Sequence, residues 1–147
     1  MIFSLLKKAR IYILVFLFIL FCGCQQKEMA KQNVCFENNC FTVDLAETYG
    51  QQTKGLMNRD SLREREGMLF VYDREEPHAI WMKDMKFAID IVWLNENKEV
   101  IFIEENVPPC VSFNCSVYKA DSASAYVLEL PAGTAATIGL TKKSVMK

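Results

Sequence analysis

The stretch Ile89–Leu94 (IDIVWL) decides the fold, together with the polar residues 95–98 (NENK) and the residues 99–105 (EVIFIEE) that follow. Two runs rich in β-branched and aromatic residues, separated by a short polar segment, predict a β-hairpin. Side chains alternate between the two faces of a strand, and both faces of the first run are apolar apart from Asp90. We therefore expect this hairpin to belong to a β-sheet.

More strands and two short helices are predicted around the hairpin. A capping-box spacing of Thr48 and Gln51 predicts a helix over residues 48–57, and a second helix over residues 134–138 ends at Gly139. The predicted strands are residues 41–45, 68–72, 78–83, 125–130 and, at the end of the chain, 140–147, with a long irregular loop over residues 106–123. Many short strands with little helix predict an α+β, mostly β fold, in which an antiparallel sheet closes into a small barrel-like structure.

The first 23 residues have the features of an export signal. Lys7, Lys8 and Arg10 form a positive region, and residues 11–21 (IYILVFLFILF) are an unbroken apolar run. That run is about half the length of a comfortable transmembrane helix. The segment ends in Phe21-Cys22-Gly23-Cys24, which resembles the lipobox of bacterial lipoproteins and predicts lipidation of Cys24. An ordinary signal peptide, or an uncleaved anchor with two incidental cysteines, is the alternative.

This signal sets the predicted organisation of the 147-residue chain. Residues 1–23 are a lipoprotein signal peptide, residues 24–39 are the lipidated N-terminus and a flexible polar tether, and residues 40–147 are one β-rich domain. Lipid chains on one cysteine anchor a protein stably, so the membrane is a predicted partner. The predicted location is the bacterial cell envelope, facing the periplasm or another extracytoplasmic side.

Four cysteines follow the signal in two pairs with the same spacing. An even number of cysteines in an exported domain predicts disulfides. The local pairing is favoured over the two other pairings because short separations close first. The alternative is a single zinc ion held by all four thiolates, which this spacing permits. The four residues are Cys35, Cys40, Cys110 and Cys115.

A set of short motifs follows a fixed order along residues 41–145. They are Gly55-Leu56-Met57-x-Arg59, Gly67-Met68-Leu69-Phe70-Val71, Trp81-Met82-Lys83, Ile89-Asp90-Ile91, Pro109-Cys110, Cys115, Tyr118, Tyr126-Val127-Leu128-Glu129 and Ala132-Gly133. In this order they resemble the domain of unknown function 192 family, a small uncharacterised domain of bacteria and archaea. The resemblance implies a compact β-rich, barrel-like fold and no particular reaction. Asp84 and Ser116 depart from the Asn and Pro that the family often has there.

One cluster predicts a small-molecule site. Lys83 and Trp81 share a strand face, Asp90 interrupts an apolar strand, and Arg59 follows the first predicted helix. A charged residue in an apolar strand is costly unless it is paired or solvated. A cation, a carboxylate and an aromatic plate together can hold a small polar ligand. The alternative is structural, with Asp90 paired to Arg59 or Lys83 to pin the helix to the sheet.

A second cluster is a candidate copper site. His78, Met82 and Met85 lie close in sequence, and imidazole with thioethers suits Cu(I). The alternative is that Met82 fills the core while His78 stands at an exposed strand start. Copper handling in the periplasm is therefore the third function that we consider.

Other function classes lack support in the sequence. The charge balance of 17 Lys and Arg against 18 Asp and Glu argues against nucleic acid as a partner, and one histidine cannot supply a mechanism with two imidazoles. No nucleophile elbow, phosphate-binding glycine loop or His-Glu-x-x-His motif is present. We predict non-enzymatic binding of a small polar ligand or an envelope partner, without a cofactor. A hydrolase or another enzyme of unrecognised type is the alternative.

Overall fold

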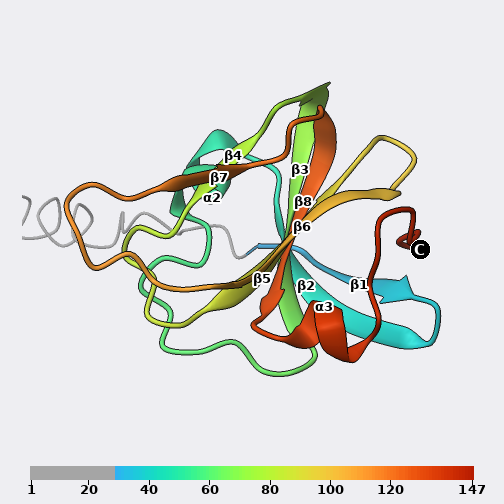
Figure 1. Cartoon of the computed structure of the whole chain (residues 1–147), viewed down its shortest axis with the longest axis horizontal. Helices are drawn as coiled ribbons and strands as arrows, with labels where there is room; N and C mark the ends of the chain where they lie inside the picture. Colours follow the sequence, from blue (N-terminus) through green and yellow to red (C-terminus); the bar gives the residue numbers. More distant parts are fainter. Residues whose placement is uncertain (1–28) are drawn as a thin grey trace, which may run out of the picture.

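The computed structural model of the chain describes residues 29–147 (Figure 1). The predicted export signal and the predicted lipid acceptor Cys24 lie outside the described residues. Within residues 29–147, no helix is long and apolar enough to cross a membrane.

Eight strands and two short helices make up the described part of the chain. In order they are β1 (Lys31–Phe36), β2 (Asn39–Ala46), α2 (Tyr49–Lys54), β3 (Glu66–Glu76), β4 (Ala79–Trp81), β5 (Ile89–Leu94), β6 (Val100–Val107), β7 (Val117–Lys119), β8 (Ser124–Pro131) and α3 (Thr134–Thr137). The predicted hairpin is confirmed as β5 and β6, which pair antiparallel. The fold is mostly β with two short helices, as predicted.

The main sheet has six strands in the order β1-β2-β3-β8-β5-β6, and β4 pairs with β7 in a second, two-stranded sheet. All pairs are antiparallel except β2 and β3, which run parallel. The prediction of an antiparallel sheet is therefore wrong at this one pair. The reason is the connection between the strands, because α2 and the loop after it carry the chain back to the start of β3, as a parallel pair requires.

Closure into a barrel is not confirmed. In the described part of the chain, the edge strands β1 and β6 do not pair with each other. The C-terminal segment, predicted as a strand, makes only isolated bridges to each edge. Cys35 and Lys147 exchange two backbone hydrogen bonds of 2.9 Å, and the Val100 amide donates to the Ser144 carbonyl at 2.8 Å. The tail thus covers both edges of an open sheet.

The strand β1 corrects the predicted domain boundary. Residues 31–36 were predicted to belong to a flexible tether ending at residue 39, yet they pair with β2 along their whole length. Val34 and Phe36 are 1 % and 4 % exposed, so this strand contributes to the core. Its first three residues are polar and exposed, which conceals the alternation of a strand. The folded domain begins at Lys31 or earlier.

Both faces of the main sheet are buried, which explains the continuous apolar runs in β3 and β5. One face carries a core cluster that includes Leu69, Val92 and Leu128 and is covered by α3 and the tail. The opposite face carries a second cluster, with Met68 and Trp93, covered by α2 and the β4–β7 sheet. Figure 1 shows α2, β4 and β7 together, away from α3 and the C-terminus. The second face holds the candidate site.

The helix α2 begins as predicted and ends three residues early. The Thr48 side chain accepts a hydrogen bond from the Gln51 amide, and the Gln51 side chain accepts one from the Thr48 amide. Gly55 follows the helix with φ 47° and ψ −136°, a conformation that favours glycine. Glycine at this position therefore stops the helix at Lys54.

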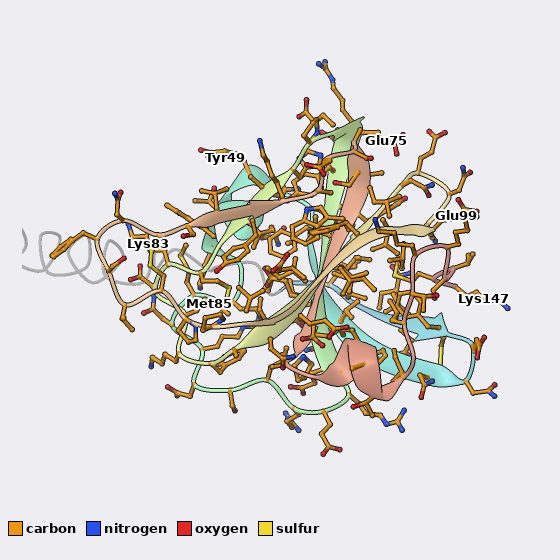
Figure 2. All side chains as sticks on the ribbon, in the orientation of Figure 1. Tyr49, Glu75, Lys83, Met85, Glu99 and Lys147 are labelled. Atoms are coloured by element: carbon orange, nitrogen blue, oxygen red, sulfur yellow. A yellow bond between two sulfur atoms is a disulfide. The ribbon has the colours of Figure 1, made fainter. Side chains whose placement is uncertain are left out.

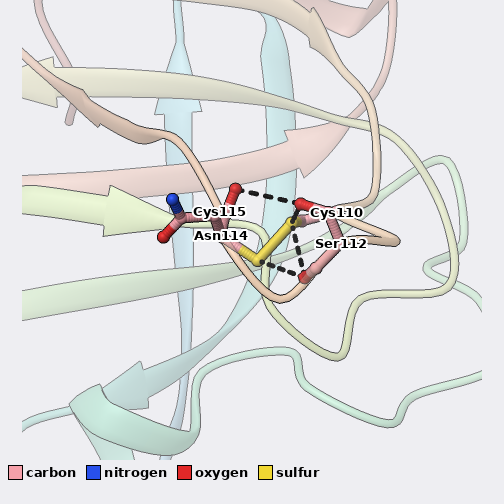
Figure 3. The surroundings of a disulfide bond; sticks show 4 residues. All are labelled: Cys110, Ser112, Asn114 and Cys115. Carbon is pink, nitrogen blue, oxygen red and sulfur yellow. Dashed lines mark hydrogen bonds between the residues drawn. A yellow bond between two sulfur atoms is a disulfide. The ribbon is translucent and has the colours of Figure 1, made fainter.

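The four cysteines form the two predicted local disulfides. Cys35 and Cys40 face each other across the β1–β2 hairpin, and Cys110 bonds Cys115 within the loop before β7 (Figure 3). In that loop the Ser112 hydroxyl also donates to the Asn114 carbonyl at 2.9 Å. Because all four thiols are paired, they are not available as ligands for one zinc ion. Disulfides of this kind are typical of proteins outside the reducing cytosol.

Candidate functional site

Asp90 has a structural position that sequence reasoning did not foresee. It is fully buried, and its carboxylate accepts three backbone hydrogen bonds. The Asn106 and Gly133 amides donate to Oδ1 at 2.8 and 3.0 Å, and the Ala135 amide donates to Oδ2 at 2.8 Å. Asp90 therefore ties β5 to the end of β6 and to the start of α3. The predicted ion pair of Asp90 with Arg59 or Lys83 is wrong, because the carboxylate is held by amides.

Arg59 pairs with a different acid. Its guanidinium lies 2.7 Å from Asp44 Oδ2, and Lys31 Nζ lies 2.7 Å from Asp44 Oδ1. Burial of Asp44 opposes ionisation, but the hydrogen bonds and charges of Lys31 and Arg59 lower the pKa of this carboxyl below its ordinary value. Arg59 thus links the segment after α2 to β2 through Asp44, and not through Asp90 as the structural alternative predicted.

Trp81 and Lys83 are the two predicted ligand-binding residues that do contact each other. Both are exposed, and Lys83 Nζ lies 5.2 Å from the centroid of the Trp81 ring. This distance is within the range of a cation–π interaction. The structure does not bring Asp90 into this group, since Asp90 is buried beneath α3.

The copper candidates are distributed over different surroundings. The His78 ring stacks on Tyr72, with centroids 3.4 Å apart, and its Nε2 lies 3.1 Å from the Arg74 carbonyl. Met82 is 1 % exposed and belongs to the core, as the alternative predicted. Met85 is half-buried and lines the same hollow as His78. Copper binding itself stays a prediction.

A pocket of about 290 Å³ lies between α2, β4 and the second face of the main sheet. We call it the aromatic pocket, because its walls are rich in rings. Its aromatic lining consists of Tyr49, Phe70, Tyr72, His78 and Trp81. Figure 2 shows two lining residues, Tyr49 and Met85, on the side of the molecule away from Lys147. A volume of this size suits a ligand built around a single ring.

The wall formed by α2 is fixed to the sheet by a side-chain amide. Gln52 Nε2 donates to the Val71 carbonyl at 2.8 Å and to the Ala46 carbonyl at 3.3 Å. These carbonyls belong to β3 and β2, so the helix cannot shift without losing both hydrogen bonds. The pocket is therefore formed in advance of any ligand.

Glu129 lies in the lining of the aromatic pocket and is the site's most unusual residue. It stands in the middle of β8, opposite Met68 and Ile91 of the neighbouring strands, and is 4 % exposed. Its Oε2 atom is buried without a hydrogen-bond partner. The one other such side-chain atom in residues 29–147 is Ser124 Oγ. Buried polar atoms are nearly always satisfied, so an unpaired carboxyl oxygen beside a pocket indicates a place for a ligand atom.

Burial also changes the protonation state of the Glu129 carboxyl. Desolvation raises the pKa of Glu129 to about 8, although the positive charge of Arg59 opposes this shift. Glu129 is therefore mostly neutral near pH 7 and both donates and accepts hydrogen bonds. Burial likewise raises the pKa of the Tyr72 hydroxyl, and the Glu129 charge adds to the effect. The pocket is thus a ring-lined hollow with one carboxylic acid, Glu129, and one cationic side chain in its lining, Lys54.

Sequence reasoning missed Glu129 as a candidate, although a signal was present. Glu129 interrupts an apolar strand in the same way as Asp90, and the two differ only in what surrounds them. Three amides satisfy Asp90, whereas Glu129 faces a pocket built from segments distant in sequence. Spacing along the chain does not show which of two buried acids has partners.

These observations define a class: a β-rich domain with a mixed six-stranded sheet, two local disulfides and a preformed pocket beside a buried acid. The chain belongs to the DUF192 family, described as "Uncharacterized ACR", which matches residues 32–147. The predicted resemblance to this family is therefore confirmed. No protein with a curated description matches the chain.

Two solved structures are similar over most of the domain. A Sinorhizobium meliloti 1021 protein described as a "putative transcription regulator" has 28 % identity and a TM-score of 0.75, covering 83 % of this chain and 96 % of its own. A Novosphingobium aromaticivorans DSM 12444 protein of unknown function has 24 % identity and a TM-score of 0.72, covering 85 % and 89 %. The second likeness concerns the fold alone.

Proposed function

We propose that this protein binds a small molecule in the aromatic pocket, with Glu129 as the hydrogen-bonding group, while a lipid on Cys24 holds it at the outer side of a membrane. The observation that carries the proposal is the unpaired Oε2 of Glu129. A ligand group that pairs with this carboxyl removes the cost of an unsatisfied buried polar atom, about 1–3 kcal/mol.

The lining of the pocket supports a ligand with two parts. Its rings offer flat apolar contact, which favours a planar or ring-shaped body. The neutral carboxylic acid offers one donor and one acceptor, which favours a group with both functions, such as an amide or a hydroxyl. A small ring with such a group satisfies both requirements within about 290 Å³.

The role at the membrane rests on the N-terminal sequence. The domain begins at Lys31 or earlier, and the residues between Cys24 and Lys31 span at most about 25 Å when fully extended. A lipid on Cys24 would therefore keep the pocket near the membrane surface. Labelling of growing cells with an alkyne fatty acid tests this part. We expect label on the wild type and on Cys22→Ser, and none on Cys24→Ser; label on Cys24→Ser would overturn it.

Calorimetric titration tests the binding itself. The probes are benzamide, a ring with a donor and an acceptor, and toluene, the same ring without a polar group. The processed full chain in lipid nanodiscs serves as the sample, with empty nanodiscs as the blank. We expect benzamide to bind about ten-fold more tightly than toluene, because only benzamide pairs with Glu129. Absence of saturable benzamide binding would overturn the proposal.

A matched variant separates the carboxyl from the shape of the pocket. Glu129→Met keeps the length of the side chain, removes both oxygens and leaves an apolar group in an apolar surrounding. The variant should lose the preference for benzamide while retaining toluene. An unchanged preference would show that Glu129 is not the group that holds the ligand. Circular dichroism and intact-mass measurement of the two disulfides confirm that the variant is folded.

A further inference from the structure

The aromatic pocket continues into a second hollow on the surface, which we call the outer groove. The two share the lining residues Tyr49, Thr53, Lys54, Met57 and Trp81. The groove adds Gly50, Lys83 and Asp84, which line it but not the pocket. One continuous cleft therefore runs from the buried Glu129 to the solvent.

The outer groove carries an excess of positive charge. Lys54 comes from the last turn of α2, Lys83 follows β4, and Asp84 is the one acid in the lining. In the described part of the chain, neither lysine lies within 4.0 Å of a carboxylate oxygen. By contrast, Lys31 and Lys86 each form an ion pair at 2.7 Å. The two groove lysines are thus available to an anion from outside the protein.

Two large aromatic side chains mark the same opening. Tyr49 is 85 % exposed and Trp81 is 43 % exposed, and both line the pocket and the groove. Exposed rings at the mouth of a cleft are typical of binding surfaces, because they offer rigid contact area with little loss of conformational freedom. The Lys83 ammonium 5.2 Å from the Trp81 centroid places a positive charge directly at this ring.

We infer that the ligand of the aromatic pocket is a small planar organic anion. Its ring lies between the pocket walls, its hydrogen-bonding group meets Glu129, and its carboxylate or phosphate faces Lys54 and Lys83. This inference rests on the proposed function and adds the charge and the direction of the ligand. The arrangement disfavours a cationic ligand, because Glu129 is mostly neutral and the Lys54 and Lys83 ammonium groups repel another positive charge.

Calorimetric titration with matched probes tests the inference. The anions are 4-carbamoylbenzoate, 4-carbamoylphenylacetate and 3-(4-carbamoylphenyl)propanoate, which differ in the distance between amide and carboxylate. Each is compared with its neutral diamide. At low ionic strength we expect at least one anion to bind about five- to ten-fold more tightly than its diamide, and this preference to fall as salt screens the charges.

Lysine variants locate the charge effect. The double variant Lys54→Gln with Lys83→Gln should lose the preference for the anion, whereas Asp84→Asn should increase it. Lys142→Gln is the matched control, because Lys142 also lies over a ring, 5.9 Å from the Phe102 centroid, but lines neither the pocket nor the groove. This control should keep the full preference.

The outcomes separate this inference from the proposed function. If benzamide binds and no anion is preferred over its diamide, the ligand is not an anion and the inference is overturned while the pocket remains a binding site. An anion preference that survives in the Lys54 and Lys83 double variant would also overturn it. If neither benzamide nor any anion binds, the proposed function fails as well.

Discussion

Replacing Glu129 by glutamine exchanges a titratable carboxyl for a neutral amide of the same shape. In the folded protein, burial raises the pKa of Glu129 from its ordinary value of 4.5 to about 8. Between these two values the folded state holds a proton that the unfolded state releases. The free energy of unfolding of the wild type therefore falls as pH rises through this window, whereas the Glu129→Gln variant has no such term.

The size of the effect follows from the two pKa values. Stability changes by about 1.4 kcal/mol for each pH unit between them, so the full effect is about 5 kcal/mol. This is comparable with the whole stability of a small domain, about 5–15 kcal/mol. The stability of Glu129→Gln minus that of the wild type should thus be smallest near pH 4.5, rise until about pH 8 and stay constant above it.

Urea unfolding of both proteins at five pH values from 5 to 9, with disulfides intact, measures this difference. Other groups cancel in the comparison when they titrate alike in both proteins. Asp44 does not interfere, because Lys31 and Arg59 lower its pKa below the window, and burial places the Tyr72 hydroxyl above it. A difference that stays constant from pH 5 to pH 9 would refute the account of Glu129 as a buried neutral acid.

Three further predictions concern the scaffold, and each is measured by urea unfolding at pH 6. Asp90→Ala leaves one buried and two part-buried amides without their acceptor and should lower the free energy of unfolding by about 3 kcal/mol or more; a loss below about 1 kcal/mol would contradict the role of Asp90. In Gly67→Ala the new Cβ would lie 2.8 Å from the Glu129 carbonyl oxygen, so we expect the free energy of unfolding to fall by about 1–3 kcal/mol. A variant as stable as the wild type would contradict this, because it would show that the two strands move apart at little cost. Replacing Cys35 and Cys40 together by serine removes the disulfide that closes a short loop and should lower the free energy of unfolding by about 2 kcal/mol. An unchanged urea midpoint would show that this disulfide does not stabilise the domain.

Local signals in the sequence predicted the elements that depend on near neighbours. The hairpin of β5 and β6, the capping box at Thr48 and the two disulfides all join residues close along the chain. The strand β1 was missed because three polar residues precede Val34. The parallel pairing of β2 with β3 depends on the path of the long connection between them. The alternation of apolar and polar residues along each strand does not predict that path.

The candidate site was also predictable only where its residues lie close together in the sequence. Trp81 and Lys83 lie two residues apart in the chain. The predicted strand over residues 78–83 is shorter in the structure, because β4 ends at Trp81, but the two side chains remain in contact. Arg59 pairs with Asp44, and Asp90 accepts hydrogen bonds from three amides. These partners lie far apart in the sequence, so the spacing of residues along the chain does not predict the contacts. Glu129 becomes a candidate only when α2 and β4 are placed over the sheet, because they create the pocket that leaves its oxygen unpaired.

Carbon-13 NMR of the glutamate side-chain carboxyls tests the central claim most directly. The sample is the processed full chain, labelled at Glu Cδ, and the resonance absent from Glu129→Gln identifies the buried acid. We predict that this resonance titrates near pH 8 and that saturating benzamide shifts it at pH 7. A Glu129 resonance that titrates near its ordinary pKa and does not respond to benzamide would contradict the account.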